Sequence, residues 1–210
     1  MRILFFISMQ PSGQDQCARM RKTTHSKRRS LDLTFLYFAY GSNMLTARLK
    51  RRCDGADPVG IAYANDRMIE FSKLSCDGSG KATLRHAPGR RTPGVLFEIP
   101  SAQSDALDRA EGFPNGYDRR KAFPVFRSDG RKVRAVTYLA KLPEPSLDAY
   151  DWYLALVIAG ALGHELDVEH VAALRSENWI PDPMVDRSSR CEAIRVLALA
   201  GHRDYRKLLT

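Results

Sequence analysis

The chain is predicted to fold as an α+β domain built on an antiparallel or mixed sheet. Strand-like segments joined by short turns dominate up to about residue 142, and helical patterns dominate after it, which is typical of this class. Of the 210 residues 44% are hydrophobic, so one globular domain with a single core is expected.

The first half is predicted to be rich in strands. The apolar stretch LTFLYFAY, residues 33–40, is typical of a buried strand, and residues 44–52 have the spacing of a short helix directly behind it. Three further strands are predicted at 61–72, 81–86 and 94–99, with Gly- and Pro-bearing turns between them.

The second half begins with a helix that Ser101 can cap and Gly112 ends. Asp129-Gly130 between two strand-like runs predicts a hairpin of residues 121–128 and 132–142. The remaining chain is predicted as an interrupted helical region at 147–175, a loop at 178–186 and a basic helix within 190–209.

The formal charge of +9 is concentrated at the beginning of the chain. Residues 1–30 hold seven Lys or Arg and one Asp, which leaves 26 bases against 23 acids, or +3, for the rest. We therefore expect a disordered basic tail at 1–32, a main domain at 33–180, and a loop and basic helix at 181–210 that packs on it. A core with so little net charge is not expected to bind nucleic acid.

Targeting and membrane signals are weak. The apolar run in MRILFFISM is short for a signal peptide and no small-residue cleavage site follows it, so we expect an untargeted, cytoplasmic protein. No apolar stretch approaches the roughly 20 residues that span a bilayer, so no membrane association is expected.

Several motifs that would indicate a metal, a cofactor or a nucleophile are incomplete. Four scattered cysteines, without a C-x-x-C pair, indicate free thiols in a reducing compartment: Cys17, Cys53, Cys76 and Cys191. The segment GSGKAT lacks the spacing of a phosphate-binding loop, and His164 and His170 are six residues apart instead of the four of a zinc helix. Ser42 lacks the flanking glycines of a nucleophile elbow. We expect neither metal nor cofactor.

One candidate site is the turn after the first strand. A strand that ends in Gly41-Ser42-Asn43 ahead of a helix leaves backbone N–H groups without partners, and these can bind a carboxylate or carbonyl oxygen. Gly41 permits close approach of a ligand, and Ser42 or Asn43 can cap the helix. The alternative is a tight turn without a binding role.

A second candidate is Glu111, the last helical residue before Gly112. The negative end of the helix dipole disfavours an ionised carboxylate there by about 0.3–1 kcal/mol, which raises its pKa. A raised pKa suits a group that takes and returns a proton near neutral pH. The alternative is an ordinary solvated surface glutamate.

Six segments in order resemble the gamma-glutamylcyclotransferases, over about residues 35–175: FAYGSNM, GKATL, GVLFEI, LDRAEG with a following GY, VRAVTYLA, and YLALVIAGALGHELDVEHVAAL. The resemblance implies a small mixed or antiparallel β-barrel with peripheral helices. It also implies that Tyr40, Gly41, Ser42 and Asn43 bind a gamma-glutamyl group, that Glu111 is the general acid/base, and that Tyr117 and Tyr138 donate hydrogen bonds in the cavity.

The implied reaction is attack of the substrate's α-amino group on its own γ-carbonyl, releasing 5-oxoproline and an amino acid or amine. YGSNMLTAR lacks the Trp that usually follows in the glutathione-specific branch, so a broader gamma-glutamyl amino acid or peptide substrate is favoured. Removal of a gamma-glutamyl mask from a larger amine, or a non-catalytic binding module of the same fold, are alternatives. The partner expected is a small-molecule substrate, and a homodimer is compatible with the sequence.

Overall fold

A computed structural model describes residues 33–210, so the predicted tail, with Cys17, lies outside the described residues. The elements, in chain order, are β1 (Thr34–Ala39), η1 (Ser42–Met44), α1 (Thr46–Lys50), β2 (Asp57–Leu74), β3 (Gly80–Pro100), η2 (Ser101–Gln103), α2 (Ser104–Ala110), β4 (Tyr117–Arg127), β5 (Lys132–Ala140), β6 (Ala149–Tyr150), α3 (Asp151–Gly163), α4 (Val168–Arg175), β7 (Trp179–Ile180), α5 (Ser188–Leu199) and η3 (Tyr205–Leu208).

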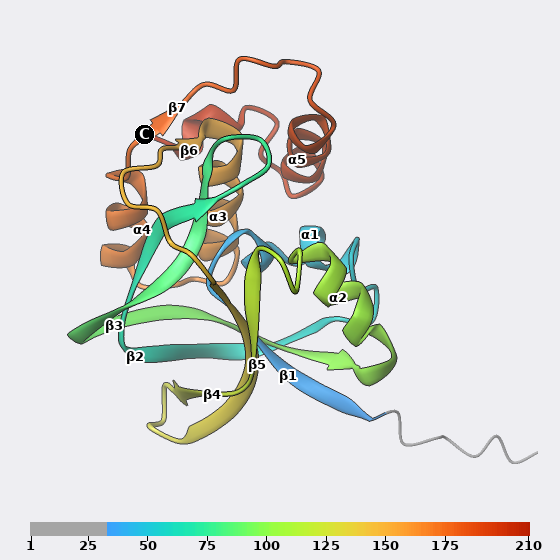
Figure 1. Cartoon of the computed structure of the whole chain (residues 1–210), viewed down its shortest axis with the longest axis vertical. Coiled ribbons are helices and arrows are strands. Elements are labelled where there is room, and N and C mark those ends of the chain that lie inside the picture. Colours follow the sequence, from blue (N-terminus) through green and yellow to red (C-terminus); the bar gives the residue numbers. More distant parts are fainter. Residues whose placement is uncertain (1–32) are drawn as a thin grey trace, which may run out of the picture. The chain divides into compact units, whose positions relative to one another are not determined.

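Five strands form a closed barrel in the order β1-β3-β2-β4-β5 (Figure 1). All neighbouring pairs are antiparallel except the closing pair, where β1 runs parallel to β5 at Tyr37 and Val136. The predicted α+β class with a mixed barrel is therefore confirmed.

The long strand β3 differs from the prediction, which placed two strands with turns between them at 81–86 and 94–99. Pro88, Gly89 and Pro93 suggest a turn in the sequence. In the structure β2 pairs with β3 along most of its length and absorbs the irregularity as bulges, one of them between Asn65 and Arg67. The predicted hairpin at Asp129-Gly130 is confirmed as the connection between β4 and β5.

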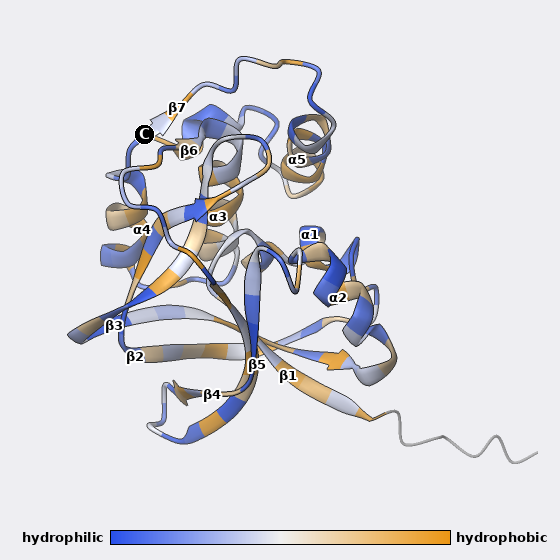
Figure 2. Cartoon of the chain, in the orientation of Figure 1, coloured by the Kyte–Doolittle hydropathy of each residue, from blue (hydrophilic) through white to orange (hydrophobic). Residues whose placement is uncertain are grey.

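Helices α3, α4 and α5 gather beside one end of the barrel, with α3 between the other two, whereas α2 lies apart from them (Figure 1). Residues 151–161 of α3 are all buried, because the helix contacts η1 on one side and α4, α5 and η3 on others. A helix that is apolar on every side is typical of such a central position. In Figure 2 β1 carries mostly hydrophobic residues, whereas α2 alternates hydrophilic and hydrophobic ones, as an element at the surface does.

The last segment is tied to the start of α3. The hydroxyl group of Tyr205 donates a hydrogen bond to the buried Asp151 carboxylate (2.8 Å), and Leu208 and Leu209 are buried beside it. Within residues 33–210 no helix is long and apolar enough to cross a membrane.

Candidate active site

The turn after β1 lies in the interior of the protein. Ser42 and Asn43 are buried in the short turn η1, whose hydrogen bond runs from the Met44 N–H to the Gly41 carbonyl (2.9 Å). Neither Ser42 nor Asn43 caps a helix, contrary to expectation, because the Asn43 amide instead donates hydrogen bonds to the side chains of Glu111 and Tyr37. The turn therefore holds the carboxylate instead of stabilising a helix end.

The central helix α3 fixes the position of this turn. A Cβ atom at Gly160 would lie 2.6 Å from the Leu45 backbone nitrogen and 2.7 Å from the Met44 Cβ atom. At the start of the turn, a Cβ atom at Gly41 would lie 3.1 Å from the Ala82 Cβ atom of β3 and 3.6 Å from the Tyr153 hydroxyl oxygen of α3. Glycine at both positions lets the turn fit between α3 and β3.

Glu111 follows α2 and precedes Gly112, whose φ of +67° ends the helix as predicted. Its Oε1 atom accepts hydrogen bonds from Asn43 and from the Tyr37 hydroxyl group (3.3 Å), and Arg52 Nη1 lies 3.9 Å away. The side chain is only 14% exposed, so it is not a solvated surface glutamate. Within the described part of the chain, Oε2 accepts no hydrogen bond, which leaves that oxygen available to a ligand.

Burial raises the pKa of the Glu111 carboxyl above its ordinary value of 4.5, and the positive charge of Arg52 partly opposes this. The direction is the one expected from the sequence. The main cause is different, because removal from water outweighs any effect of the helix end.

The tyrosines around Glu111 use their hydroxyl groups to hold the barrel together. Tyr40 donates to the Tyr138 carbonyl, Tyr117 donates to the Ala82 carbonyl (2.8 Å), and Tyr138 donates to Asp108 Oδ1 (2.5 Å). Tyr117 and Tyr138 therefore line the pocket, but their hydroxyl protons are directed to protein acceptors and not into the cavity as expected.

Four residues of the site were not anticipated from the sequence: Tyr37, Ala82 and Tyr153, which line the pocket, and Arg52, which lies near Glu111. The Tyr153 hydroxyl oxygen accepts a hydrogen bond from the Ala82 N–H (3.0 Å). A tyrosine within the mostly apolar, buried part of α3, residues 152–161, is a signal that could have indicated it, since a buried hydroxyl group needs a partner. Tyr37 gives no such signal, because any residue of a buried strand faces one side of it or the other.

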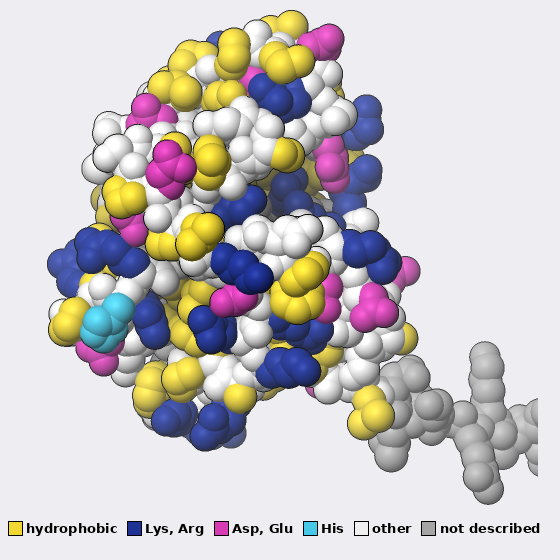
Figure 3. Space-filling model, in the orientation of Figure 1, with side chains coloured by type: hydrophobic (Ala, Val, Ile, Leu, Met, Phe, Trp, Pro, Cys, Tyr) yellow, Lys and Arg dark blue, Asp and Glu magenta, His cyan; other side chains and the backbone are white. Residues whose placement is uncertain are grey.

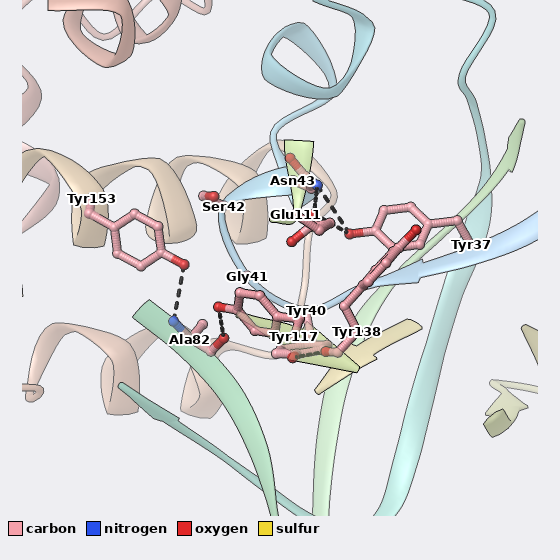
Figure 4. Close-up of a pocket in the computed structure, with 10 residues that line it drawn as sticks. All are labelled: Tyr37, Tyr40, Gly41, Ser42, Asn43, Ala82, Glu111, Tyr117, Tyr138 and Tyr153. Atoms are coloured by element: carbon pink, nitrogen blue, oxygen red, sulfur yellow. Dashed lines mark hydrogen bonds between the residues drawn. The ribbon is translucent and has the colours of Figure 1, made fainter. Parts of the chain in front are cut away.

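Together these groups line a small polar pocket of about 30 Å³ (Figure 4). Its ten lining residues are Tyr37, Tyr40, Gly41, Ser42, Asn43, Ala82, Glu111, Tyr117, Tyr138 and Tyr153. All seven residues singled out from the sequence are among them. Figure 4 shows Glu111 beside Asn43 and Tyr37, with Tyr153 on α3 reaching Ala82 from the other side.

The pocket can hold a small polar group next to a carboxylate that is able to exchange a proton. The phenols that surround it stay neutral, because burial and the negative charge of Glu111 both raise the pKa values of Tyr37 and Tyr40. Among the ten residues that line the pocket, all of which lie within residues 33–210, Glu111 is the one with an acidic side chain. Among residues 33–210 no group of three or more His, Cys, Asp or Glu side chains is placed to hold a metal ion.

The chain is similar to known proteins in sequence and in fold. The family described as "Gamma-glutamyl cyclotransferase, AIG2-like" matches residues 37–154, the segment that contains every strand of the barrel from Tyr37 onward and the start of α3. A human gamma-glutamylcyclotransferase is 28% identical over 148 residues, which cover 68% of this chain and 78% of the relative.

Solved structures agree with the sequence match. A structure titled gamma-glutamyl cyclotransferase superposes with a TM-score of 0.69 at 26% identity, covering 78% of this chain and 99% of the other. An uncharacterized human protein superposes with a TM-score of 0.68 at 26% identity, covering 77% and 98%. Since the matched segment exceeds half of the chain and carries the pocket, the chain belongs to the gamma-glutamyl cyclotransferase, AIG2-like family.

Proposed function

We propose that the protein is a gamma-glutamylcyclotransferase that converts a gamma-glutamyl amino acid or peptide into 5-oxoproline and the free amino acid or peptide. The observation that carries the proposal is the position of Glu111, whose carboxylate lies in one pocket with the Tyr40–Asn43 turn. Membership of the family and the name of the human relative support the same reaction.

The first task of such an enzyme is to fold the substrate. The glutamyl chain must bend so that its α-amino nitrogen approaches its own γ-carbonyl carbon, and holding reacting atoms in this geometry can supply about 7–11 kcal/mol in favourable cases. The pocket alone has room for only a small group, so the glutamyl chain would lie partly in the larger cavity that shares Glu111 and Tyr117 with it. The walls of the pocket belong to the barrel and to α3, which suits them to hold the chain in a fixed geometry.

Proton transfer is the second task. The α-amino nitrogen forms a bond to the γ-carbonyl carbon and gives its proton to Glu111, and the bond from that carbon to the departing nitrogen then breaks as the nitrogen takes a proton from Glu111. A carboxylate with a raised pKa serves both steps, because it is a stronger base when ionised and still gives up its proton readily.

Stabilisation of the oxygen is the third task. The γ-carbonyl oxygen becomes negative during attack and needs fixed donors. The N–H groups at the beginning of η1 have no partner within that turn, which makes those of Ser42 and Asn43 suitable donors.

The test is to replace Glu111 by Gln, which keeps the shape of the side chain and removes the base. Release of 5-oxoproline from gamma-glutamyl amino acids, glutathione and gamma-glutamyl amines is measured for both forms. We expect turnover to fall at least about 100-fold with the fold intact. The exposed Glu144, changed to Gln, is the matched control and should leave turnover unchanged.

Two outcomes would contradict the proposal. Full activity of the Glu111→Gln variant would exclude Glu111 as the base. Absence of 5-oxoproline from every compound with the wild-type protein, together with measurable binding of one of them, would favour a non-catalytic binding module.

A further inference from the structure

A second, larger cavity adjoins the pocket of Glu111. It has a volume of about 400 Å³ and shares Ser42, Glu111, Tyr117 and Tyr153 with the smaller pocket. A substrate that places the reacting end of its glutamyl part at the smaller pocket, beside Glu111, would therefore extend its leaving group into the larger one.

Four cationic side chains line this larger cavity: Arg48, Arg52, Lys81 and Arg187. Only two acidic side chains, Asp77 and Glu111, line it with them. Figure 3 shows a hollow with Lys and Arg side chains inside it, at the place where Figure 1 has α1 and α5. The wall thus carries an excess of positive charge.

Two of the four cations already have carboxylate partners. Lys81 Nζ lies 2.9 Å from Asp77 Oδ2, and Arg187 Nε lies 2.8 Å from Asp182 Oδ2. These two ion pairs neutralise Lys81 and Arg187, so the excess positive charge of the cavity comes from Arg48 and Arg52.

Arg52 and Arg48 differ from each other. Arg52 donates a hydrogen bond to Asn43 Oδ1 (2.7 Å) and lies near Glu111, so it serves the smaller pocket. Arg48 is only 7% exposed, and its Nε and Nη1 atoms have no hydrogen-bond partner within the described residues. Burial and the neighbouring Arg52 lower the pKa of Arg48 to about 10, which leaves it charged at neutral pH.

A buried cation without a partner is costly unless a ligand supplies the opposite charge. An amino acid leaving group carries a carboxylate two bonds from the nitrogen that departs, whereas a simple amine carries none. Guanidinium groups bind carboxylates through strong, charge-assisted hydrogen bonds.

We propose that the larger cavity is the leaving-group subsite and that Arg48 binds the α-carboxylate of the departing amino acid. Arg48 then determines specificity for gamma-glutamyl amino acids over gamma-glutamyl amines. This inference rests on the proposed cyclotransferase function and adds to it the residue that selects the leaving group.

The experiment compares gamma-glutamyl-L-alanine with gamma-glutamyl-L-alaninamide, which differ only in that carboxylate. For the wild-type protein we expect kcat/KM for 5-oxoproline release to be at least about 10-fold higher with the carboxylate. Replacing Arg48 by Met should bring the ratio to about 1. Arg51→Met is the matched control, because Arg51 lies at the surface beside Glu192 (3.5 Å), and it should keep the wild-type ratio.

A binding measurement gives a readout that does not depend on turnover or on the folding of the Arg48 variant. Calorimetry with the Glu111→Gln protein should show weaker binding of the amide than of the carboxylate compound. Equal kcat/KM values for both compounds in the wild type would overturn the inference and leave the cyclotransferase function standing.

Two further results would also decide the matter. If Arg48→Met lowers kcat/KM equally for both compounds, Arg48 binds the glutamyl part and the inference is wrong. If the wild type releases no 5-oxoproline from any compound, the proposed function itself fails, and the inference fails with it.

Discussion

Replacing Gly160 by Ala should displace the turn that forms one wall of the site, although the new methyl group collides only with Met44 and Leu45, which do not line the smaller pocket. The added methyl group would lie 2.6 Å from the Leu45 nitrogen, 2.7 Å from the Met44 Cβ atom and 2.8 Å from the Met44 carbonyl carbon. Ordinary van der Waals contact begins at 3.4 Å, so α3 and the turn must separate by about 0.6–0.8 Å.

The size of the effect follows from two opposing contributions. Alanine in a helix is favoured over glycine by about 0.5–1 kcal/mol, whereas overpacking of a filled core costs about 1–3 kcal/mol. The net loss of stability should be about 1–2 kcal/mol, or roughly 2–8 °C in Tm for a chain of this size. A displacement approaching 1 Å can also cost about 100-fold in kcat/KM when it moves catalytic groups.

Gly163 provides a matched control in the same helix. A Cβ atom there meets nothing within 4 Å, so Gly163→Ala has the helix preference without the collision. Thermal unfolding and 5-oxoproline release would be measured for both variants. Equal Tm and equal kcat/KM for the two would refute the reasoning that close packing of α3 positions the turn.

Two predictions concern the charge on Glu111. Arg52→Gln removes the cation that lies 3.9 Å from Glu111, which should raise the pKa of Glu111 further and move the acidic limb of the pH profile of kcat/KM to higher pH. The control Arg51→Gln should leave the limb in place. An unchanged limb in Arg52→Gln would show that Arg52 does not act on the base. The pKa of Glu111 in the folded protein is raised above 4.5, so ionisation of Glu111 lowers the free energy of unfolding as pH rises through that pKa. Glu111→Gln should therefore be more stable than the wild type at pH 7, and the difference should vanish below about pH 4.5. Urea unfolding at several pH values measures this difference, and a variant less stable than the wild type at pH 7 would contradict the prediction.

Local patterns were sufficient for the elements whose signals lie within a few residues. The strand before Gly41, the hairpin at Asp129-Gly130 and the end of α2 at Gly112 each depend on turn chemistry and alternation that the sequence displays directly. The continuity of β3 through Gly89 could not be predicted, because it depends on pairing with β2. Mixed-barrel closure was expected from the resemblance and not from periodicity.

In the site, too, local sequence patterns indicated some residues, whereas contacts between distant segments could not be predicted. Local patterns made Glu111 and the turn at 41–43 candidates, each with an ordinary structural alternative, and the resemblance then implied their roles; the structure brings them into one pocket. The partners of the hydroxyl groups of Tyr117 and Tyr138 depend on strands and helices far apart in the chain, so their hydrogen bonds to Ala82 and Asp108 could not be read from the sequence. Arg52 was missed for a related reason, since a basic residue at the end of a short helix is usually a surface residue.

The closure of the barrel by β1 and β5 has a consequence for how the protein folds. Tyr37 reaches Glu111 across 74 residues of chain, and Tyr40 reaches the Tyr138 carbonyl across 98. Contacts of such long range form slowly, because closing the long intervening segment of chain lowers its conformational entropy before the contacts can stabilise it. A ribosome-bound chain would therefore lack the pocket until β5 and α3 had emerged, and appearance of activity would report completion of the barrel.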